Sequence, residues 1–515
     1  MRLISLLIIP FAGAIACYLA ERLRSGSGRI VALLTSVALI IATVDIGLDI
    51  PSYAPTYFLW TSLPWSPSAG ISFTLGMDGL GFILVALSAL INIIAVGCSW
   101  FYINKKPGAF YFCMLWVIGG TLGVFMAHDL FLFYFFWEMM LIPMYFLIGV
   151  WGHDEVIRLR AAIKFFLYTF IGGLFLLAAI LGLYWIHGQQ SGVYTFDYNA
   201  LLTTHLTLSQ QTWLLAGFFI GFAVKLPIFG LHTWLPDAHT EAPTGGSIDL
   251  AGLLLKTGAY GLIRFAIPFC PEAWAHFGYA AGVLGIVGIF YGAFLAFAQN
   301  DMKRLIAYSS ISHMGFILLA LAANNTIAGQ GAVMQMVAHG LSSGALFALV
   351  GMIDERYHTR NLNELGGLWQ KLPRLSGFVI FFAIASLGLP GLGNFVAEFL
   401  TLVGTYAVWP SLAIIGGIGL FFAAAYTLKM IGQSIYGSYH LSNPELGDLS
   451  PREWSLLAPL CIGLIWLGLL PGTMLRLSET WWEQTFPHPP ALIEAMPTLD
   501  QGIQNKSQQA KESFE

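Results

Sequence analysis

Long apolar runs recur along the chain, and short breaks rich in polar residues, glycine or proline separate them. Each run is close to the roughly 20 residues that a helix needs to cross the apolar core of a membrane. Strands of a membrane barrel would span about 10 residues with strict apolar–polar alternation, which these runs lack. The pattern therefore predicts an all-α membrane protein with about 14 transmembrane helices. The runs lie at 3–20, 30–48, 80–101, 110–127, 130–150, 162–186, 212–234, 244–267, 276–298, 303–322, 328–352, 376–406, 411–436 and 454–475.

The composition narrows the function classes. Of the 515 residues, 57% are hydrophobic and only 10% are charged, whereas soluble domains are about 25% charged. This excludes a soluble enzyme and a disordered chain. The net charge of -4 gives no support for a nucleic-acid partner. The five cysteines form no CxxC pair, and no glycine-rich nucleotide motif is present, so we expect neither a metal nor a cofactor in this chain.

The basic residues fall mostly in alternate breaks between the runs. If every run crosses the membrane, fifteen of the 23 lysines and arginines share one side. Cytoplasmic loops are enriched in such residues, so we expect these fifteen in the cytoplasm of a bacterium, with both termini on the periplasmic side of the inner membrane. The polar tail from about 476 to 515 is expected to lack fixed structure. The fifteen are Arg22, Arg24, Arg29, Lys105, Lys106, Arg158, Arg160, Lys164, Lys303, Arg304, Arg356, Arg360, Lys371, Arg374 and Arg452.

Four ionisable residues lie deep within apolar runs: Glu138, Lys225, Lys256 and Glu398. A charge at the centre of a bilayer costs about 2.5–3.5 kcal/mol on insertion scales, so such residues usually pair, line water or carry ions. Glu138 has at least seven apolar residues on each side, which places it beyond reach of either membrane surface. Each of the four has a structural alternative. These are a hydrogen-bonded neutral acid for Glu138, a side chain that extends to the membrane surface for Lys225, a static ion pair for Lys256, and a capping or packing acid for Glu398.

Two of the runs carry signals for interrupted helices. Pro227 follows Lys225 by two residues, and a run of glycines around Pro390 precedes Glu398. Proline removes a backbone donor and breaks a helix interior. Broken helices at membrane depth are tolerated where they line a cavity. An offset of 173 residues relates Lys225 to Glu398 and Lys256 to Lys429, which suggests a duplicated module at the level of helix order.

Histidines are the other groups in the runs that could carry protons. His313 and His339 fall near the middle of consecutive runs, and we expect them in a relay, with hydrogen-bonded packing as the alternative. His232 and His239 flank the expected break after Lys225, but their spacing is not that of a metal site.

Three other residues in the runs have structural interpretations. Lys429 lies toward the cytoplasmic end of its run, and a long side chain there usually extends to the membrane surface. Trp137 and Trp234 are expected to serve packing or anchoring at the interface.

Three stretches of the chain resemble the antiporter-like membrane subunits of proton-translocating NADH:quinone oxidoreductase, respiratory complex I. They are FFWEMMLIPMYFLIGVWG at 135–152, FAVKLPIFGLHTWLPDAHTEAPTGGSIDLAGLLLKTGAYGLIRF at 222–265 and NDMKRLIAYSSISHMGF at 300–316. The resemblance extends over about residues 75 to 440. Glutamate at position 398 favours the M type of these subunits, because the L and N types resemble one another in having lysine there. The tail is also too short for the long lateral helix of the L type.

The resemblance implies an organisation of fourteen helices with two inverted five-helix repeats, each containing one broken helix. The N-terminal helices then occupy 1–108, the repeats 109–270 and 271–440 as two proton half-channels, and the last helix and tail 441–515.

The resemblance also implies roles for the six buried ionisable residues. Glu138 and Lys225 match the interacting pair of the first half-channel, and Lys256 matches the central connecting lysine. Glu398 matches the ionisable residue of the second broken helix, and the remaining two, His313 and His339, match histidines of a central polar axis.

The expected function is proton translocation within a quinone-reducing translocase. NADH, FMN, iron–sulfur clusters and quinone would bind to partner subunits, because this chain shows no redox motif. The expected partners are other membrane subunits of complex I, especially chains L and N, and the lipid bilayer. Two alternatives remain: a subunit of a multi-subunit Na⁺/H⁺ antiporter, and a purely structural membrane scaffold.

Overall fold

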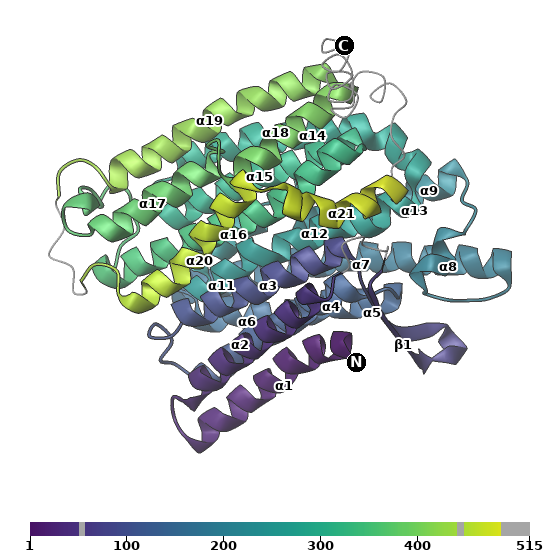
Figure 1. Cartoon of the computed structure of the whole chain (residues 1–515), viewed down its shortest axis with the longest axis horizontal. Coiled ribbons are helices and arrows are strands. Elements are labelled where there is room, and N and C mark those ends of the chain that lie inside the picture. The colour runs from purple at the N-terminus through teal and green to yellow at the C-terminus, as the bar shows by residue number, and fades with distance from the viewer. Residues whose placement is uncertain (51–56, 440–446, 486–515) are drawn as a thin grey trace, which may run out of the picture.

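The computed structural model describes residues 1–50, 57–439 and 447–485, and its helices form one elongated bundle (Figure 1). Within these residues, twelve helices are long and apolar enough to cross a membrane. Two further crossings are interrupted helices, so the prediction of about fourteen is confirmed. The crossings are α1 (Arg2–Leu23), α2 (Ser27–Leu48), α3 (Gly79–Cys98), α4 (Pro107–Met126), α5 and α6 (Leu130–Met139 and Leu141–Trp151), α7 (Glu155–Ser191), α9 and α10 (Leu208–Lys225 and Trp234–Glu241), α11 to α13 (Thr244–Asp249, Leu255–Gly261 and Ile267–Phe269), α14 (Pro271–Ala298), α15 (Met302–Ala323), α16 (Thr326–Tyr357), α17 and α18 (Pro373–Ser386 and Gly393–Val408), α19 (Pro410–Ser434) and α20 (Pro451–Leu469).

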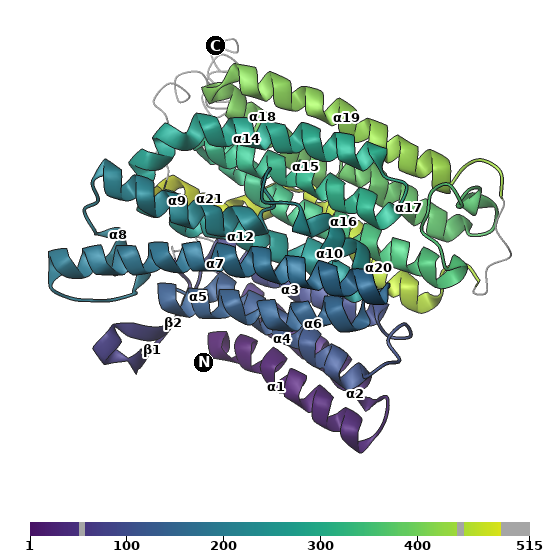
Figure 2. The same ribbon diagram turned by 180° about the vertical axis from the view of Figure 1, so that it is seen from behind.

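The crossings from α4 to α19 form two groups of five. The first group runs from α4 to α13 and the second from α14 to α19, and the fourth crossing of each group is the interrupted one. An odd number of crossings places the start of the second group on the opposite face of the membrane, so the two groups are inverted relative to each other. Figure 2 shows α14 and α19 of the second group lying on the far side of the bundle from α1.

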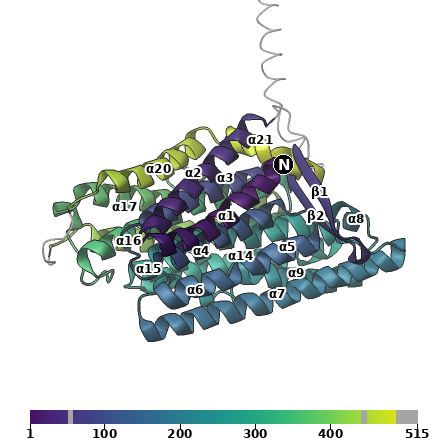
Figure 3. The ribbon, with the colours of Figure 1, turned by 90° about the horizontal axis from the view of Figure 1, so that it is seen from below.

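A β-hairpin stands outside the helical bundle, and the apolar pattern did not predict it. β1 (Leu59–Ser66) pairs antiparallel with β2 (Ile71–Met77). The strands are rich in residues that favour sheets, and the turn between them contains Gly70 at φ +68°. Figure 3 shows the hairpin beside the short helix α8 (Tyr198–Leu202) at one end of the bundle. We call this end the hairpin face.

The C-terminal tail begins as a helix, so the expectation of no fixed structure from about 476 is wrong as far as Thr485. Helix α21 (Gly472–Thr485) packs against α3 and α16. Its buried residues recur at helical spacing and form one apolar stripe, which the overall polarity of the segment concealed. Residues 486–515 lie outside the described part of the chain. The buried residues are Met474, Ser478, Trp481 and Trp482.

The fifteen basic residues expected on one side lie in, or beside, the connections at the end of the bundle opposite the hairpin. We call this end the basic face. Contacts tie its connections together: the Arg29 guanidinium donates to the Ile103 carbonyl at 3.0 Å, and that of Arg452 donates to the Gly97 carbonyl at 2.9 Å. The alternation of charge along the sequence therefore corresponds to a real separation of the two faces.

A buried ion pair fixes α20 at the basic face. Both terminal nitrogens of Arg356 lie 2.9 Å from the carboxylate oxygens of Glu453, and both side chains are buried. Arg356→Gln would leave the Glu453 carboxylate buried without its partner. We expect it to lower the free energy of unfolding by about 3–5 kcal/mol, measured as thermal unfolding of the protein in detergent.

The double variant Arg356→Met/Glu453→Met removes both charges and is expected to recover much of the lost stability. Arg374→Gln, at an exposed arginine of the same face, is the control. Equal stability of the Arg356→Gln variant and the Arg374→Gln variant would contradict the assignment.

Candidate functional site

Six ionisable side chains form what we call the polar row: Glu138, Lys225, Lys256, His339, His313 and Glu398. Five of them are less than 5% exposed, and Glu138 is half-buried. They come from α5, α9, α12, α16, α15 and α18, which are distant in sequence. All six therefore lie inside the bundle or at its edge, as predicted.

The first end of the polar row is formed by Lys225 and two neighbouring residues of α5. The Lys225 ammonium lies 4.2 Å from the centre of the Trp137 ring and donates to the Trp137 carbonyl at 3.4 Å. Glu138 interacts with it electrostatically, but no ion pair within 4 Å joins them among the described residues. Trp137 was expected only to pack or anchor. It instead holds the ammonium in place, which the sequence did not reveal.

One carboxylate oxygen of Glu138, Oε1, is buried and has no hydrogen-bond partner among the described residues. Gly173 of α7 faces it so closely that a Cβ there would lie 1.9 Å from Oε1. A buried carboxylate oxygen without a hydrogen bond is energetically costly. A water molecule or a changed charge beside Glu138 would therefore alter the energy of its ionised form.

The break after Lys225 is held open by specific contacts. Lys225 is the last residue of α9, and α10 resumes only at Trp234. Gly230 takes a φ of +92° within the break, and the Trp234 indole donates to the Val224 carbonyl at 2.9 Å. Trp234 thus satisfies a carbonyl that the interruption would leave without a partner, a more specific role than the expected packing.

Lys256 occupies the centre of the polar row. It lies on α12 between two π-helical turns, Leu250–Leu254 and Leu262–Ala266, a distortion often found at functional sites. Its Nζ atom donates to the Ala251 carbonyl and lies 2.8 Å from Nδ1 of His339. Lys256 is fully buried, and His339 is the member of the row that it contacts.

The second half of the polar row is closely spaced, although no hydrogen bond joins His339 to His313 among the described residues. The rings of His339 and His313 lie 5.4 Å apart between centroids. Nδ1 of His313 lies 3.2 Å from Oε1 of Glu398, and its Nε2 lies 3.1 Å from the Ser386 hydroxyl. The Gln335 amide reaches both His313 at 3.2 Å and Glu398 at 3.4 Å. Groups that can each bind and release a proton therefore follow one another from Lys256 to Glu398.

The second break brings backbone close to Glu398. Helix α17 ends at Ser386, and Gly388 and Gly391 take φ values of +84° and +93°. A Cβ on Gly388 would lie 2.6 Å from Oε2 of Glu398. Only glycine fits this conformation without strain, so the glycine run serves both the turn and the approach to the carboxylate.

Lys225 and Lys256 are separated by a closely packed contact between α9 and α12. A Cβ on Gly258 would lie 2.6 Å from the backbone nitrogen of Leu226 and 2.7 Å from the Phe222 carbonyl. No hydrogen bond joins the two lysines among the described residues. Transfer between them would require water or side-chain movement.

Two further ionisable groups are buried outside the polar row. Asp249 precedes the first π turn, and neither of its carboxylate oxygens has a hydrogen-bond partner among the described residues. The same holds for both ring nitrogens of His239, whose ring stacks on Phe347 at 4.5 Å. The sequence analysis missed Asp249, although an acid seven residues before Lys256 in one apolar run was a usable signal.

Lys429 lies apart from the polar row. Its Nζ atom donates to the carbonyls of Phe297 and Gln299, at 2.7 and 2.8 Å, at the end of α14 on the basic face. This agrees with a lysine that extends toward the membrane surface. No group of three or more His, Cys, Asp or Glu side chains in the described ranges could hold a metal ion.

Comparisons with known proteins agree with the fold and the motifs. The family described as "NADH:quinone oxidoreductase/Mrp antiporter, TM" matches residues 127–423, more than half of the chain. The chain is 49% identical over 484 residues to NADH-quinone oxidoreductase subunit M of Pseudomonas aeruginosa, covering 92% of this chain and 95% of that protein.

Two solved structures are similar to the chain. A chain of respiratory complex I from Thermus thermophilus is 31% identical with a TM-score of 0.85, covering 94% of this chain and 99% of that one. A chain of the Mrp complex from Dietzia sp. is 23% identical with a TM-score of 0.81, covering 93% of this chain and 52% of that one. The second likeness concerns the fold alone.

Proposed function

Because the chain belongs to the NADH-quinone oxidoreductase subunit M family, we propose that it conducts protons along the polar row while electrons pass through partner subunits. It is an antiporter-like membrane subunit of complex I, a proton translocase, and its partners are other subunits of that complex. The observation that carries the proposed route is the close succession of Lys256, His339, His313 and Glu398, in which hydrogen-bond contacts join Lys256 to His339 and His313 to Glu398 and the two histidine rings lie 5.4 Å apart.

The proposal extends to the surroundings of the chain. Chains L and N would be its neighbours, and FMN, iron–sulfur clusters, NADH and quinone would bind to partner subunits. The basic face would lie in the bacterial cytoplasm and both termini in the periplasm. Residues 109–270 and 271–440 would form the two half-channels, with 1–108 and 441–515 outside them. The interrupted fourth crossing in each group of five supports this division.

The proposed cycle starts at the pair of Glu138 and Lys225. A carboxylate near an ammonium group stabilises the charged form of both. When a neighbouring subunit alters the charge or hydration at Glu138, Lys225 loses that support in its buried site and releases its proton toward Lys256. Moving one charge across 100 mV costs about 2.3 kcal/mol, which is within reach of a change in one buried ion-pair interaction.

The second part of the proposed cycle uses two contacts that are already formed, Lys256 with His339 and His313 with Glu398. Lys256 passes a proton to His339, whose Nδ1 faces it, and the proton continues to His313 and Glu398. The hydroxyl of Ser386 and the amide of Gln335 orient His313 on two sides. Glu398, beside the second break, is the proposed point of exit from the row.

The experiment that tests this function uses the assembled complex in proteoliposomes. NADH and quinone are expected to drive acidification of the lumen, and a sodium gradient without NADH is expected to produce none. Sodium-dependent proton exchange without NADH would instead identify the chain as part of a Na⁺/H⁺ antiporter. Unchanged pumping after neutralisation of Glu138, Lys225, Lys256 and Glu398 would identify it as a scaffold.

The contact between Trp137 and Lys225 gives a separate prediction. Trp137→Leu removes the ring face beneath the ammonium, and a desolvated cation–π contact contributes about 1–2 kcal/mol. We expect NADH-driven pumping to fall about fivefold, with Trp137→Phe intermediate because it retains a ring. Trp213→Leu, at a tryptophan 78% exposed on α9, is the matched control. Full pumping by the Trp137→Leu variant would show that the ring only packs.

A further inference from the structure

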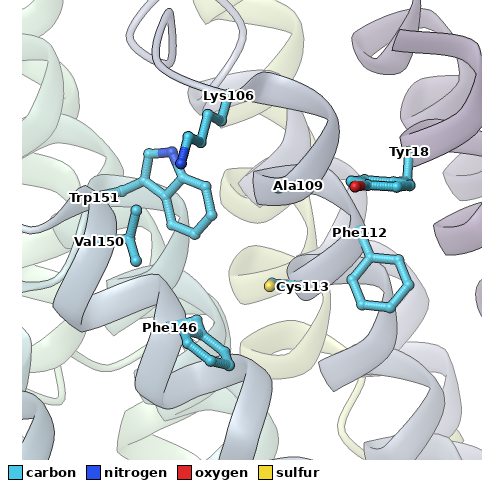
Figure 4. A pocket seen from close by; sticks show the side chains of 8 residues that line it. All are labelled: Tyr18, Lys106, Ala109, Phe112, Cys113, Phe146, Val150 and Trp151. Atoms are coloured by element: carbon cyan, nitrogen blue, oxygen red, sulfur yellow. The ribbon is translucent and has the colours of Figure 1, made fainter. Parts of the chain in front are cut away.

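An apolar groove opens on the outside of the bundle between α1, α4 and α6, near the basic face. Its volume is about 390 Å³, within the range of about 300–1,000 Å³ typical of small-molecule sites. Figure 4 shows Phe146 and Phe112 on opposite walls, Cys113 between them, and Lys106 beside Trp151 at one end. Phe146 is 45% exposed, so the groove opens outward from the bundle.

Two cations stand at the end of the groove nearest the basic face. Lys106 lines the groove itself. Arg22 is held against a second lining residue, Tyr18: its Nη2 atom donates to the Tyr18 hydroxyl at 2.6 Å, and its guanidinium carbon lies 4.7 Å from the centre of the ring. Arg22 is therefore held in place beside the mouth, and Lys106 is an exposed residue of its lining.

Two further polar groups near the mouth are engaged within the fold. The Trp151 indole donates to the Lys105 carbonyl at 2.6 Å. The neighbouring acid, Glu21, accepts from the backbone nitrogens of Gly26 and Gly28 at 2.8 and 2.9 Å. Glu21 thus serves the turn between α1 and α2, and the two cations leave positive charge at the mouth for an incoming anion.

We propose that this groove binds an anionic phospholipid, with its phosphate between Arg22 and Lys106 and one acyl chain along Phe112 and Phe146. Basic pockets between membrane helices on the cytoplasmic side recognise anionic headgroups, and lysine and arginine at this depth lie level with lipid phosphates. The groove places positive charge near the membrane surface, where the lipid phosphate would lie, and an apolar wall deeper in the membrane, where the acyl chain would lie. This site is separate from the polar row.

The test uses the assembled complex in nanodiscs that contain a trace of phospholipid with a photoactivatable acyl chain. Phosphatidylglycerol and phosphatidylcholine carrying the same label are compared. Crosslinks are mapped to the peptides that contain Phe112 and Phe146. We expect phosphatidylglycerol to label these peptides about tenfold more than phosphatidylcholine.

The variant Arg22→Gln/Lys106→Gln is expected to reduce labelling by phosphatidylglycerol to the level of phosphatidylcholine. Arg160→Gln, at an exposed arginine of the same face, is expected to leave it unchanged. Ala109→Trp fills the groove and is expected to block labelling by both lipids. Equal labelling by the two lipids, unchanged labelling of the double variant, or no labelling because another subunit covers the groove would each overturn the proposal.

Discussion

Replacing Glu138 with glutamine, or Lys225 with alanine, is expected to abolish most NADH-driven proton pumping by the assembled complex. Glu138 is the only acid that the structure places beside Lys225 among the residues described, and its Oε1 atom has no other partner there. Without the carboxylate, the ammonium has no charge partner whose strength a neighbouring subunit could change. We expect a loss of at least about tenfold, because removing one partner leaves the buried charge of the other uncompensated.

The measurement is lumen acidification in proteoliposomes, normalised to the amount of assembled complex. Glu155→Gln provides a matched control, because that side chain is 80% exposed and lies at the basic face. NADH oxidation with an artificial electron acceptor reports on the partner subunits and is expected to persist. Wild-type pumping in both the Glu138→Gln and the Lys225→Ala variants would end the mechanism.

The sequence was sufficient for the crossings and for both interruptions. Apolar runs are long enough to count one by one, and proline and glycine mark the places where backbone bonds cannot continue. The buried ionisable residues were equally visible, because a charge in an apolar run is expensive. Each of these features depends on residues that are close together in the chain, so a single sequence is enough to predict them.

The contacts among those residues were not predictable in the same way. His339 faces Lys256 because α16 packs along the distorted α12 segment, and no spacing in the sequence encodes that rotation. In the sequence, Trp137 is one of many aromatic residues in an apolar run. Its role became visible only from the position of the Lys225 ammonium over its ring. Helix α21 was missed because its buried stripe is short and interleaved with polar residues.

The duplication is a feature of helix order and not of residue register. The offset of 173 pairs Lys225 with Glu398, but Lys225 ends α9 before the first break, whereas Glu398 lies in α18 after the second. The same offset pairs Lys256, at the centre of the bundle, with Lys429, which reaches the basic face. The two groups therefore share a plan while placing their ionisable residues on opposite sides of the interruption.

The contact between Lys256 and His339 leads to the second large prediction, which separates proton transfer from a structural role. His339→Gln keeps a polar side chain able to hydrogen-bond the Lys256 ammonium, but an amide does not bind and release protons near neutral pH. If the row conducts protons, pumping is expected to fall at least about tenfold, because transfer then ends at Lys256. A structural role predicts that glutamine is tolerated.

The control for that variant is His276→Gln, at an exposed histidine of α14. Lys256→Arg is an independent test of proton release at this position. It retains the positive charge, but the arginine side chain does not release its proton in proteins. Both row variants are expected to assemble, as judged by the amount of chain recovered with the complex, and to lose pumping. Assembly together with undiminished pumping in His339→Gln would mean that protons bypass His339, and the route from Lys256 to Glu398 would have to be carried by water alone.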